Sequence, residues 1–239
     1  MSELFSIQLQ NRQQQGRDGV WLDLPTTTEQ VQAALRQIGI SSDNPQGLFI
    51  SGYFAEEEKR FAISYNMVLA SNVDELNFLA SRLETLSTGE RAELNAALQA
   101  PQSELFSIGR ITDFPENVDY YVHLPDVHGP AQLGDYYLNR SGMVNMPEEW
   151  KGGIDTAQFG RYVAQQEQGA FTQYGYLVKS GDEWQKVHEG QPVPEEYRVL
   201  SFPAPEVLRD SANIPPPVQP ETEPQKVIPI ILNGKDSAE

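Results

Sequence analysis

The sequence predicts an α+β protein made of small consecutive domains, with a helical hairpin in the centre. Three observations support this prediction. Strand and helix patterns alternate over residues 1–70, two amphipathic helix patterns follow each other over residues 71–104, and mixed patterns return over residues 105–180. The chain has 239 residues, of which 39% are hydrophobic and 10% are aromatic. This composition is sufficient for one large core or for two or three small ones.

Four segments within residues 1–70 have the pattern of β-strands. In the first, Phe5, Ile7 and Leu9 recur at a spacing of two, which is typical of a half-buried strand. A turn-like run of glutamine and glycine separates the first two strands, so we expect them to form a hairpin. A charged turn, AEEEKR, joins the last two. The expected strands are Leu4–Gln10, Val20–Leu24, Gly47–Phe54 and Phe61–Asn66.

A helix is expected between the second and third strands. Thr27 and Gln30 have the spacing of a capping box, which satisfies backbone N–H groups at the start of a helix. Gly39 can end the helix because glycine adopts the left-handed conformation at low cost. The apolar stripe of this helix consists of Val31, Ala34, Leu35 and Ile38.

Residues 71–104 predict a central domain of two short helices. Ser71 is the expected N-cap of the first, and Ser87 with Glu90 forms a second capping box. Pro101 ends the second helix. A short Ser-Thr-Gly connection favours a helical hairpin. The apolar faces consist of Leu76, Leu79, Leu83 and Leu86 in the first helix, and of Leu94, Ala97 and Leu98 in the second.

Residues 105–180 are expected to form a C-terminal α/β domain, which is also the candidate dimerisation domain. Pro130 can open a helix that Gly142 ends, and Asp155 can cap a second helix that Gly169 follows. The expected strands are Leu105–Ile111, Asp119–Leu124 and Ala170–Lys179, and the expected helices cover residues 131–140 and 155–166.

The character of the chain changes after residue 180. Residues 181–202 have the pattern of two short strands around a Gly/Pro loop, which predicts an added hairpin. Residues 203–239 are dense in proline and predict an extended, mostly disordered tail. Within this tail, Val227–Leu232 could add one strand, which Pro229 would restrict to the edge of a sheet.

The chain is strongly acidic. It has 17 Lys and Arg against 34 Asp and Glu, which gives a net charge of −17, and the excess is spread along the whole chain. This charge argues against direct binding to nucleic acid or to an anionic membrane, and it favours partners with basic surfaces. The alternative interpretation is that the acidity serves solubility alone.

Several classes of protein are disfavoured by what the sequence lacks. There is no cysteine, which excludes disulfides, thiolate catalysis and cysteine-based zinc sites. The N-terminus has neither the basic region nor the apolar run of a signal peptide, and no apolar stretch is long enough to cross a membrane. We therefore expect a cytoplasmic protein.

No enzymatic or cofactor-binding motif stands out. The sequence contains no phosphate-binding glycine loop, nucleophile elbow or zinc-protease motif. His123, Asp126 and His128 offer possible metal ligands or acid/base groups, but the two histidines are five residues apart across a proline. A loop or strand-end role is the favoured interpretation. We predict no enzyme activity, no cofactor and no metal, and keep a hydrolase built on these three residues as an alternative.

Several motifs occur in an order that resembles the ArdA antirestriction family. They are GVWLDLP at residues 19–25, VDELNFLASRLETLS at 73–87, a run from SIGRITDFPEN to QLGDYYLNRSG at 107–142, and MVNMPEEWKGGIDTAQFGRYVAQQEQGAFTQYGYL at 143–177. The resemblance covers about residues 4–178. The chain departs from the family in its extra residues after about 180. A second departure is RFAISYN, which occurs where many members are more acidic.

The resemblance implies an elongated α/β chain of three small domains that dimerises through the C-terminal domain. It also implies a non-enzymatic DNA mimic. Rows of carboxylates would occupy the DNA groove of a type I restriction-modification enzyme and protect mobile DNA. The alternative is an acidic interaction protein of the same fold that binds another basic, DNA-binding host protein. The candidate contact residues are Glu56, Glu57, Glu58, Asp74, Glu75, Glu84, Glu90, Glu93, Asp119, Asp126, Asp135, Glu148, Glu149 and Asp155.

Overall fold

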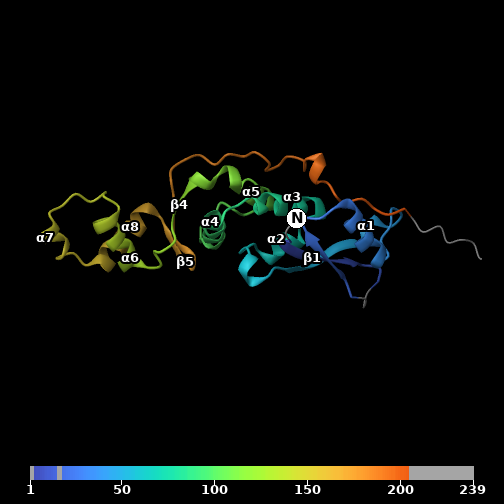
Figure 1. Ribbon diagram of the computed structural model, residues 1–239, viewed down its shortest axis with the longest axis horizontal. Coiled ribbons are helices and arrows are strands. Elements are labelled where there is room, and N and C mark those ends of the chain that lie inside the picture. The colour runs from blue at the N-terminus through green and yellow to red at the C-terminus, as the bar shows by residue number, and fades with distance from the viewer. Residues whose placement is uncertain (1–2, 15–17, 205–239) are drawn as a thin grey trace, which may run out of the picture. The chain divides into compact units, whose positions relative to one another are not determined.

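Two small antiparallel sheets lie in the part of the chain that the computed structural model describes, residues 3–14 and 18–204 (Figure 1). Each sheet has three strands, in the orders β2-β1-β3 and β4-β6-β5. The strands are β1 (Phe5–Asn11), β2 (Val20–Leu24), β3 (Leu48–Phe54), β4 (Tyr121–Leu124), β5 (Ala170–Thr172) and β6 (Gly175–Lys179).

Helices separate these strands along the described chain, and a 3-10 turn follows the last of them. The mixture of helices and small antiparallel sheets confirms the α+β class, whereas the division into consecutive domains stays a prediction. The α-helices are α1 (Thr28–Gln37), α2 (Tyr65–Leu69), α3 (Val73–Glu84), α4 (Thr88–Gln99), α5 (Ile108–Thr112), α6 (Pro130–Asp135), α7 (Glu148–Lys151) and α8 (Thr156–Glu167). The short 3-10 turns are η1 (Pro45–Gly47), η2 (Glu57–Lys59), η3 (Phe114–Glu116), η4 (Val118–Tyr120) and η6 (Glu195–Tyr197), and α6 continues into a π-helical turn, η5 (Tyr136–Arg140).

The N-terminal sheet confirms the predicted hairpin of β1 and β2. Phe5, Ile7 and Leu9 are buried, as their spacing predicts, and β1 pairs on its other side with β3. Helix α1 starts with the predicted capping box, and its apolar stripe is buried. Gly39, just after the helix, has a φ of +67°. These features were predictable because each depends on residues close together in the chain.

The predicted strand Phe61–Asn66 is wrong. Phe61 and Ile63 are buried alternately, as in a strand, but they pair with no neighbouring strand. Instead, the side chain of Asn95 on α4 bonds to this segment: its Oδ1 accepts from the backbone N–H of Ala62, and its Nδ2 donates to the carbonyl of Arg60. A side chain therefore satisfies the backbone groups that a strand would have satisfied.

The two central helices exist, but they do not form the expected hairpin. Both start with capping boxes; the cap of α3 is Asn72 rather than Ser71, and that of α4 is Ser87 as predicted. Figure 1 shows α4 seen along its axis, whereas α3 runs across the view. Helix α4 packs on β4 and β6 of the second sheet, while α3 packs on β2 and α5.

The C-terminal part contains both predicted helices and the second sheet. The predicted strand Leu105–Ile111 is wrong, because Ser107 caps helix α5 there. Only the last four residues of the predicted strand Asp119–Leu124 are extended, as β4. The predicted single strand Ala170–Lys179 is a hairpin of β5 and β6. Helices α6 and α8 pack closely on each other.

Residues 180–204, here termed the strap, do not form the predicted hairpin, because no strand occurs in them. They run in an extended path over α5 and α3, as the orange ribbon in Figure 1 shows. Val199 is buried in the larger hydrophobic core, which also includes β1, α1, α3 and α4. A smaller cluster around Leu133 and Tyr176 serves the C-terminal part.

The described residues all belong to one compact unit of the chain. The proline-rich tail predicted for residues 203–239, and the edge strand predicted at Val227–Leu232, lie almost wholly outside the described residues. The predicted boundaries at residues 70, 104 and 180 stay predictions.

Candidate acidic surface

Three of the predicted contact carboxylates cap helices. Glu75 accepts from the backbone N–H of Asn72 at 3.4 Å, and Glu90 accepts from that of Ser87 at 2.7 Å. Asp155 accepts from the N–H of Gln158 at 2.9 Å. Hydrogen bonds from Ser87 hold the pKa of Glu90 below its usual value. These carboxylates contribute to helix stability, and their negative charge remains at the positive ends of the helix dipoles.

Asp74 is used within the fold. Its Oδ1 accepts from the backbone N–H groups of Val199 and Leu200, each at 2.7 Å. The carboxylate therefore anchors the strap to α3. An oxygen that already accepts two backbone hydrogen bonds is less available to a basic partner than one that faces water.

Glu93 points into a partly buried environment on α4. Its Oε1 is buried and has no hydrogen-bond partner in the described part of the chain. Burial, with repulsion from Glu90 and Asp119, raises the pKa of Glu93 from 4.5 to about 7. A carboxyl group that is half protonated near neutral pH is a poor substitute for a phosphate.

Replacing Glu93 by glutamine is expected to stabilise the protein at pH 8 but not at pH 5. The folded state retains the Glu93 proton up to about pH 7, whereas the unfolded chain loses it near pH 4.5, so this group makes stability fall as pH rises between these values. The free energy of unfolding at pH 8 should increase by about 1–2 kcal/mol after allowance for solvent screening. Urea unfolding at both pH values measures it, with the exposed Glu149→Gln as the control. An equal effect of Glu93→Gln at both pH values would contradict a raised pKa of Glu93.

Three other candidates form ion pairs with neighbouring bases. The pairs are Glu56 with Lys59 at 3.0 Å, Asp135 with Arg140 at 3.3 Å, and Glu148 with Lys151 at 3.0 Å. All three carboxylates remain substantially exposed, and such surface pairs contribute little free energy. A basic partner can therefore displace the intramolecular base at low cost.

The remaining candidates differ in exposure. Glu84 is partly exposed near the end of α3. The others are exposed, and in the described residues their side chains form no hydrogen bond or ion pair; they are Glu57, Glu58, Asp119, Asp126 and Glu149. These five are the candidates best placed to meet a cationic surface.

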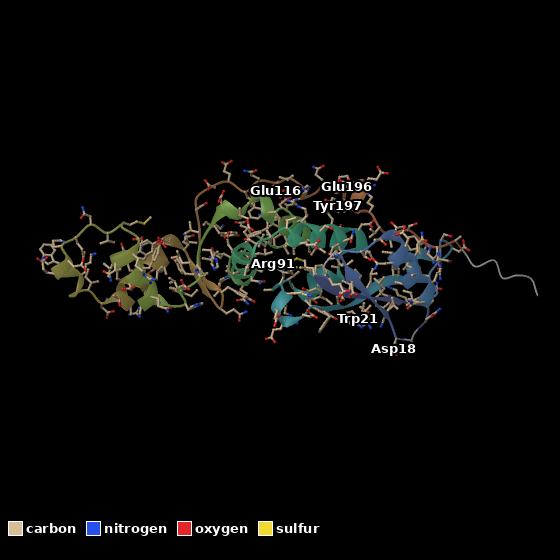
Figure 2. The ribbon with its side chains drawn as sticks, viewed as in Figure 1. Asp18, Trp21, Arg91, Glu116, Glu196 and Tyr197 are labelled. Carbon is tan, nitrogen blue, oxygen red and sulfur yellow. The ribbon has the colours of Figure 1, made fainter. Side chains whose placement is uncertain are left out.

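The strap adds carboxylates that the sequence analysis did not include, because it assigned these residues to an added hairpin. Glu183, Glu195 and Glu196 are exposed, and Figure 2 shows Glu196 on the same side of the view as Glu116, with Asp18 on the opposite side. Acidic side chains therefore occur on more than one side of the described chain. Their high density in residues 182–196 was a signal that the sequence already contained.

The residues weighed as catalytic do not form a metal site. The Nε2 of His123 donates to the carbonyl of Tyr174 at 2.7 Å, and both Asp126 and His128 are exposed. Among the described residues, no group of three or more His, Cys, Asp or Glu side chains could hold a metal ion. In the same part of the chain, no helix is both long and apolar enough to cross a membrane.

A comparison with protein-family models identifies the family of the chain. The model of the family described as Antirestriction protein (ArdA) matches residues 15–178. The chain belongs to the ArdA family. A search of curated proteins found no match. The predicted resemblance is therefore confirmed over most of its length, and the strap lies beyond the matched residues.

ArdA membership implies an antirestriction function and an interaction with restriction-modification enzymes. The family is non-catalytic.

Proposed function

We propose that this ArdA protein is an acidic DNA mimic that occupies the DNA-binding groove of a type I restriction-modification enzyme and thereby protects mobile DNA. The family match over residues 15–178 carries the proposal. The excess of 34 acidic over 17 basic residues supports it, because a groove that binds phosphates also attracts carboxylates. The protein needs no catalytic residue, cofactor or metal for this role, and it acts in the cytoplasm, where incoming DNA is cleaved.

The proposed binding depends on many weak contacts. Each exposed carboxylate contributes little by itself, so no single residue is expected to dominate. Together the carboxylates displace the counterions of the basic groove, and the affinity should fall as salt is added. Exposed residues whose side chains bond to no other described residue, such as Glu57, Glu58 and Glu149, are the first candidates for contact.

We further propose that the protein acts as a homodimer through its C-terminal part. Three large apolar side chains there are unusually exposed: Met143 at 77%, Trp150 at 69% and Tyr162 at 59%. Exposed aromatic and methionine side chains are typical of protein interfaces. Sedimentation of the wild-type protein and of a Trp150→Ala variant tests this proposal.

The function is tested by plating unmodified phage on cells with an active type I enzyme. Cells that express the protein should plate the phage with much higher efficiency, and the methyltransferase core of the enzyme should co-purify with it. Cells without the restriction enzyme provide the control. Unchanged plating with normal expression would contradict the proposal.

Neutralising Glu57 and Glu58 together with glutamine is expected to weaken binding to the enzyme roughly threefold to tenfold at low salt, and less at high salt. The matched control neutralises Glu29 and Asp43, two exposed carboxylates of the same N-terminal part that are not proposed contacts. Titration at two salt concentrations measures the effect. If both double variants weaken binding equally, net charge rather than position determines affinity.

The strap is the observation that supports a second candidate function. It lies outside the family match and carries exposed carboxylates of its own. We propose as the alternative that the same fold binds another basic, DNA-binding host protein. Restriction that is unaffected, together with co-purification of such a protein, would favour this alternative.

A further inference from the structure

The outer face of the N-terminal sheet carries two exposed aromatic side chains. Trp21 on β2 is 51% exposed and Phe54 on β3 is 56% exposed, and their ring centroids lie 6.5 Å apart in an edge-on arrangement. Figure 2 shows Trp21 near Asp18 on one side of the view. Exposed aromatic side chains of this size are more typical of an interface than of a free surface.

The indole ring of Trp21 lies close to the backbone of β3. Gln8 on the central strand pairs with Trp21 on one side and with Gly52 on the other. A Cβ on Gly52 would lie only 3.0 Å from Cη2 of Trp21, so the ring reaches across β1 as far as β3. Because Gly52 has no side chain, the ring has room to lie over the sheet at this point.

Carboxylates lie beside the Phe54 side of this aromatic pair. A hollow of about 230 Å³ beside Phe54 is lined by Glu3, Asp23 and Glu56, together with Lys59. Asp23 accepts from the Ser6 hydroxyl at 2.6 Å, and Glu56 pairs with Lys59 at 3.0 Å. Three carboxylates therefore face one ammonium group, and the hollow is negative.

The same sheet shows how an arginine binds to such a ring. The guanidinium of Arg12 lies 5.4 Å from the centroid of Phe49, which pairs with Gln10 at the other end of the sheet. Among the described residues, no cationic side chain lies over Trp21 or Phe54. The aromatic pair thus has the geometry and the charge for a cation that the described residues do not supply.

We propose that this face, defined by Trp21, Phe54, Asp23 and Glu56, binds an arginine side chain of a protein partner. A guanidinium group stacks on an aromatic face and bonds to a carboxylate at its edge, which a lysine ammonium does less well. The carboxylates repel nucleic acid and would be left desolvated by an apolar peptide. The proposal rests on the proposed function at one point: we take the arginine to be one that lines the DNA groove of the restriction enzyme.

The direct test uses a peptide, so it does not depend on the restriction enzyme. The full-length ¹⁵N-labelled protein is titrated with acetyl-Gly-Arg-Gly-amide and, separately, with acetyl-Gly-Lys-Gly-amide. We expect the arginine peptide to shift the Trp21 indole signal and the amides of Asp23 and Phe54, and the lysine peptide to shift them less. Equal shifts with both peptides, or none at these residues, would overturn the proposal.

Variants locate the binding and distinguish the possible occupants. Trp21→Thr should weaken binding of the arginine peptide at least about threefold, and Asp23→Asn should weaken it while the indole stays in place. Phe106→Ala, which removes an exposed aromatic side chain elsewhere in the chain, should have no effect. Sedimentation of the Trp21→Thr variant tests whether the face binds a second copy of the chain instead. If this variant loses a dimer that the wild type forms, the proposal is wrong. If the arginine peptide binds but the protein does not raise phage plating, the inference about this face holds and only the proposed function is contradicted.

Discussion

Alanine at position 160 is expected to lower the free energy of unfolding of the C-terminal part by about 3 kcal/mol or more. A Cβ on Gly160 would lie 1.8 Å from the carbonyl oxygen of Pro130, and a Cβ on Gly134 would lie 1.9 Å from that of Thr156. Both obstacles are backbone atoms, so no side-chain rotation can relieve them, and α6 and α8 would have to separate. Alanine normally favours a helix over glycine by about 1 kcal/mol, so the expected effect has the opposite sign to helix propensity.

Gly89→Ala is the matched control for Gly160→Ala. Gly89 lies in α4, and a Cβ there would meet no atom within 4 Å, so this change should be neutral or slightly stabilising. Urea unfolding gives the free energies, and hydrogen exchange shows whether protection is lost mainly over residues 121–178. A Gly160→Ala variant as stable as the wild type would show that the two helices are not in contact.

This close contact gives a physical reason for two of the glycines in the motifs on which the resemblance to the family rests. Gly134 belongs to the Leu-Gly pair of LGDYY, and Gly160 to the Phe-Gly-Arg motif. The sequence shows that the glycines are present, but it does not show that they meet, because they lie 26 positions apart. Their shared role becomes visible only in the packing of α6 on α8.

Features that depend on neighbouring residues were predicted well from the sequence. The capping boxes at Thr27 and Ser87 and the cap at Asp155 are where their spacing placed them. The buried stripes of α1 and α3 follow equally from helical periodicity. In each case the residues that determine the structure lie within a few positions of each other.

Two of the errors, the strand expected at Phe61–Asn66 and the hairpin expected at residues 181–202, share one physical cause: distant asparagine and aspartate side chains bond to the backbone where a neighbouring strand was expected. Asn95 bonds to the backbone at residues 60–62, and Asn117 bonds to both backbone groups of Gln185 in the strap. Asn77 accepts from the N–H of Thr26 and donates to the carbonyl of Tyr197. Alternating apolar residues predict an extended chain in these places, but they cannot show what bonds to it.

The acidic surface was predicted in composition but only partly in position. The sequence shows which residues carry charge, but it does not show that Asp74 anchors the strap or that Glu93 lies partly buried. Both depend on elements far away in the chain. The exposed group around Glu57 and Glu58 was easier to predict, because it lies in a short charged turn.

Replacing Asp113 by alanine is expected to release the strap, with a loss of about 3 kcal/mol of local stability. Asp113 is fully buried, and its carboxylate accepts from the backbone N–H groups of His188 at 2.6 Å and of Glu189 at 3.2 Å. Alanine leaves both N–H groups without this acceptor, and each unpaired buried group costs about 1–3 kcal/mol. Detachment of the strap into water avoids that cost.

Limited proteolysis with trypsin measures the release. The strap contains Lys186 and Arg198, so cleavage at these residues should accelerate at least about tenfold in Asp113→Ala. The emission of Trp184, whose ring contacts Tyr120 at 5.1 Å, should shift to longer wavelength. Asp182→Ala is the control, because Asp182 lies in the same strap but is exposed and, within the described part of the chain, bonds to Ser180 alone.

A double variant distinguishes release of the strap from a general loss of stability. Asp74 anchors the other end of the strap through Val199 and Leu200, far in sequence from Asp113. If both carboxylates hold one segment, Asp74→Ala should add little to the effect of Asp113→Ala, because a released strap has few bonds left to lose. If the two effects add fully, each carboxylate stabilises its own helix and the strap is not a single unit. The same pair of variants, measured in the phage-plating assay, shows whether the strap carboxylates take part in antirestriction.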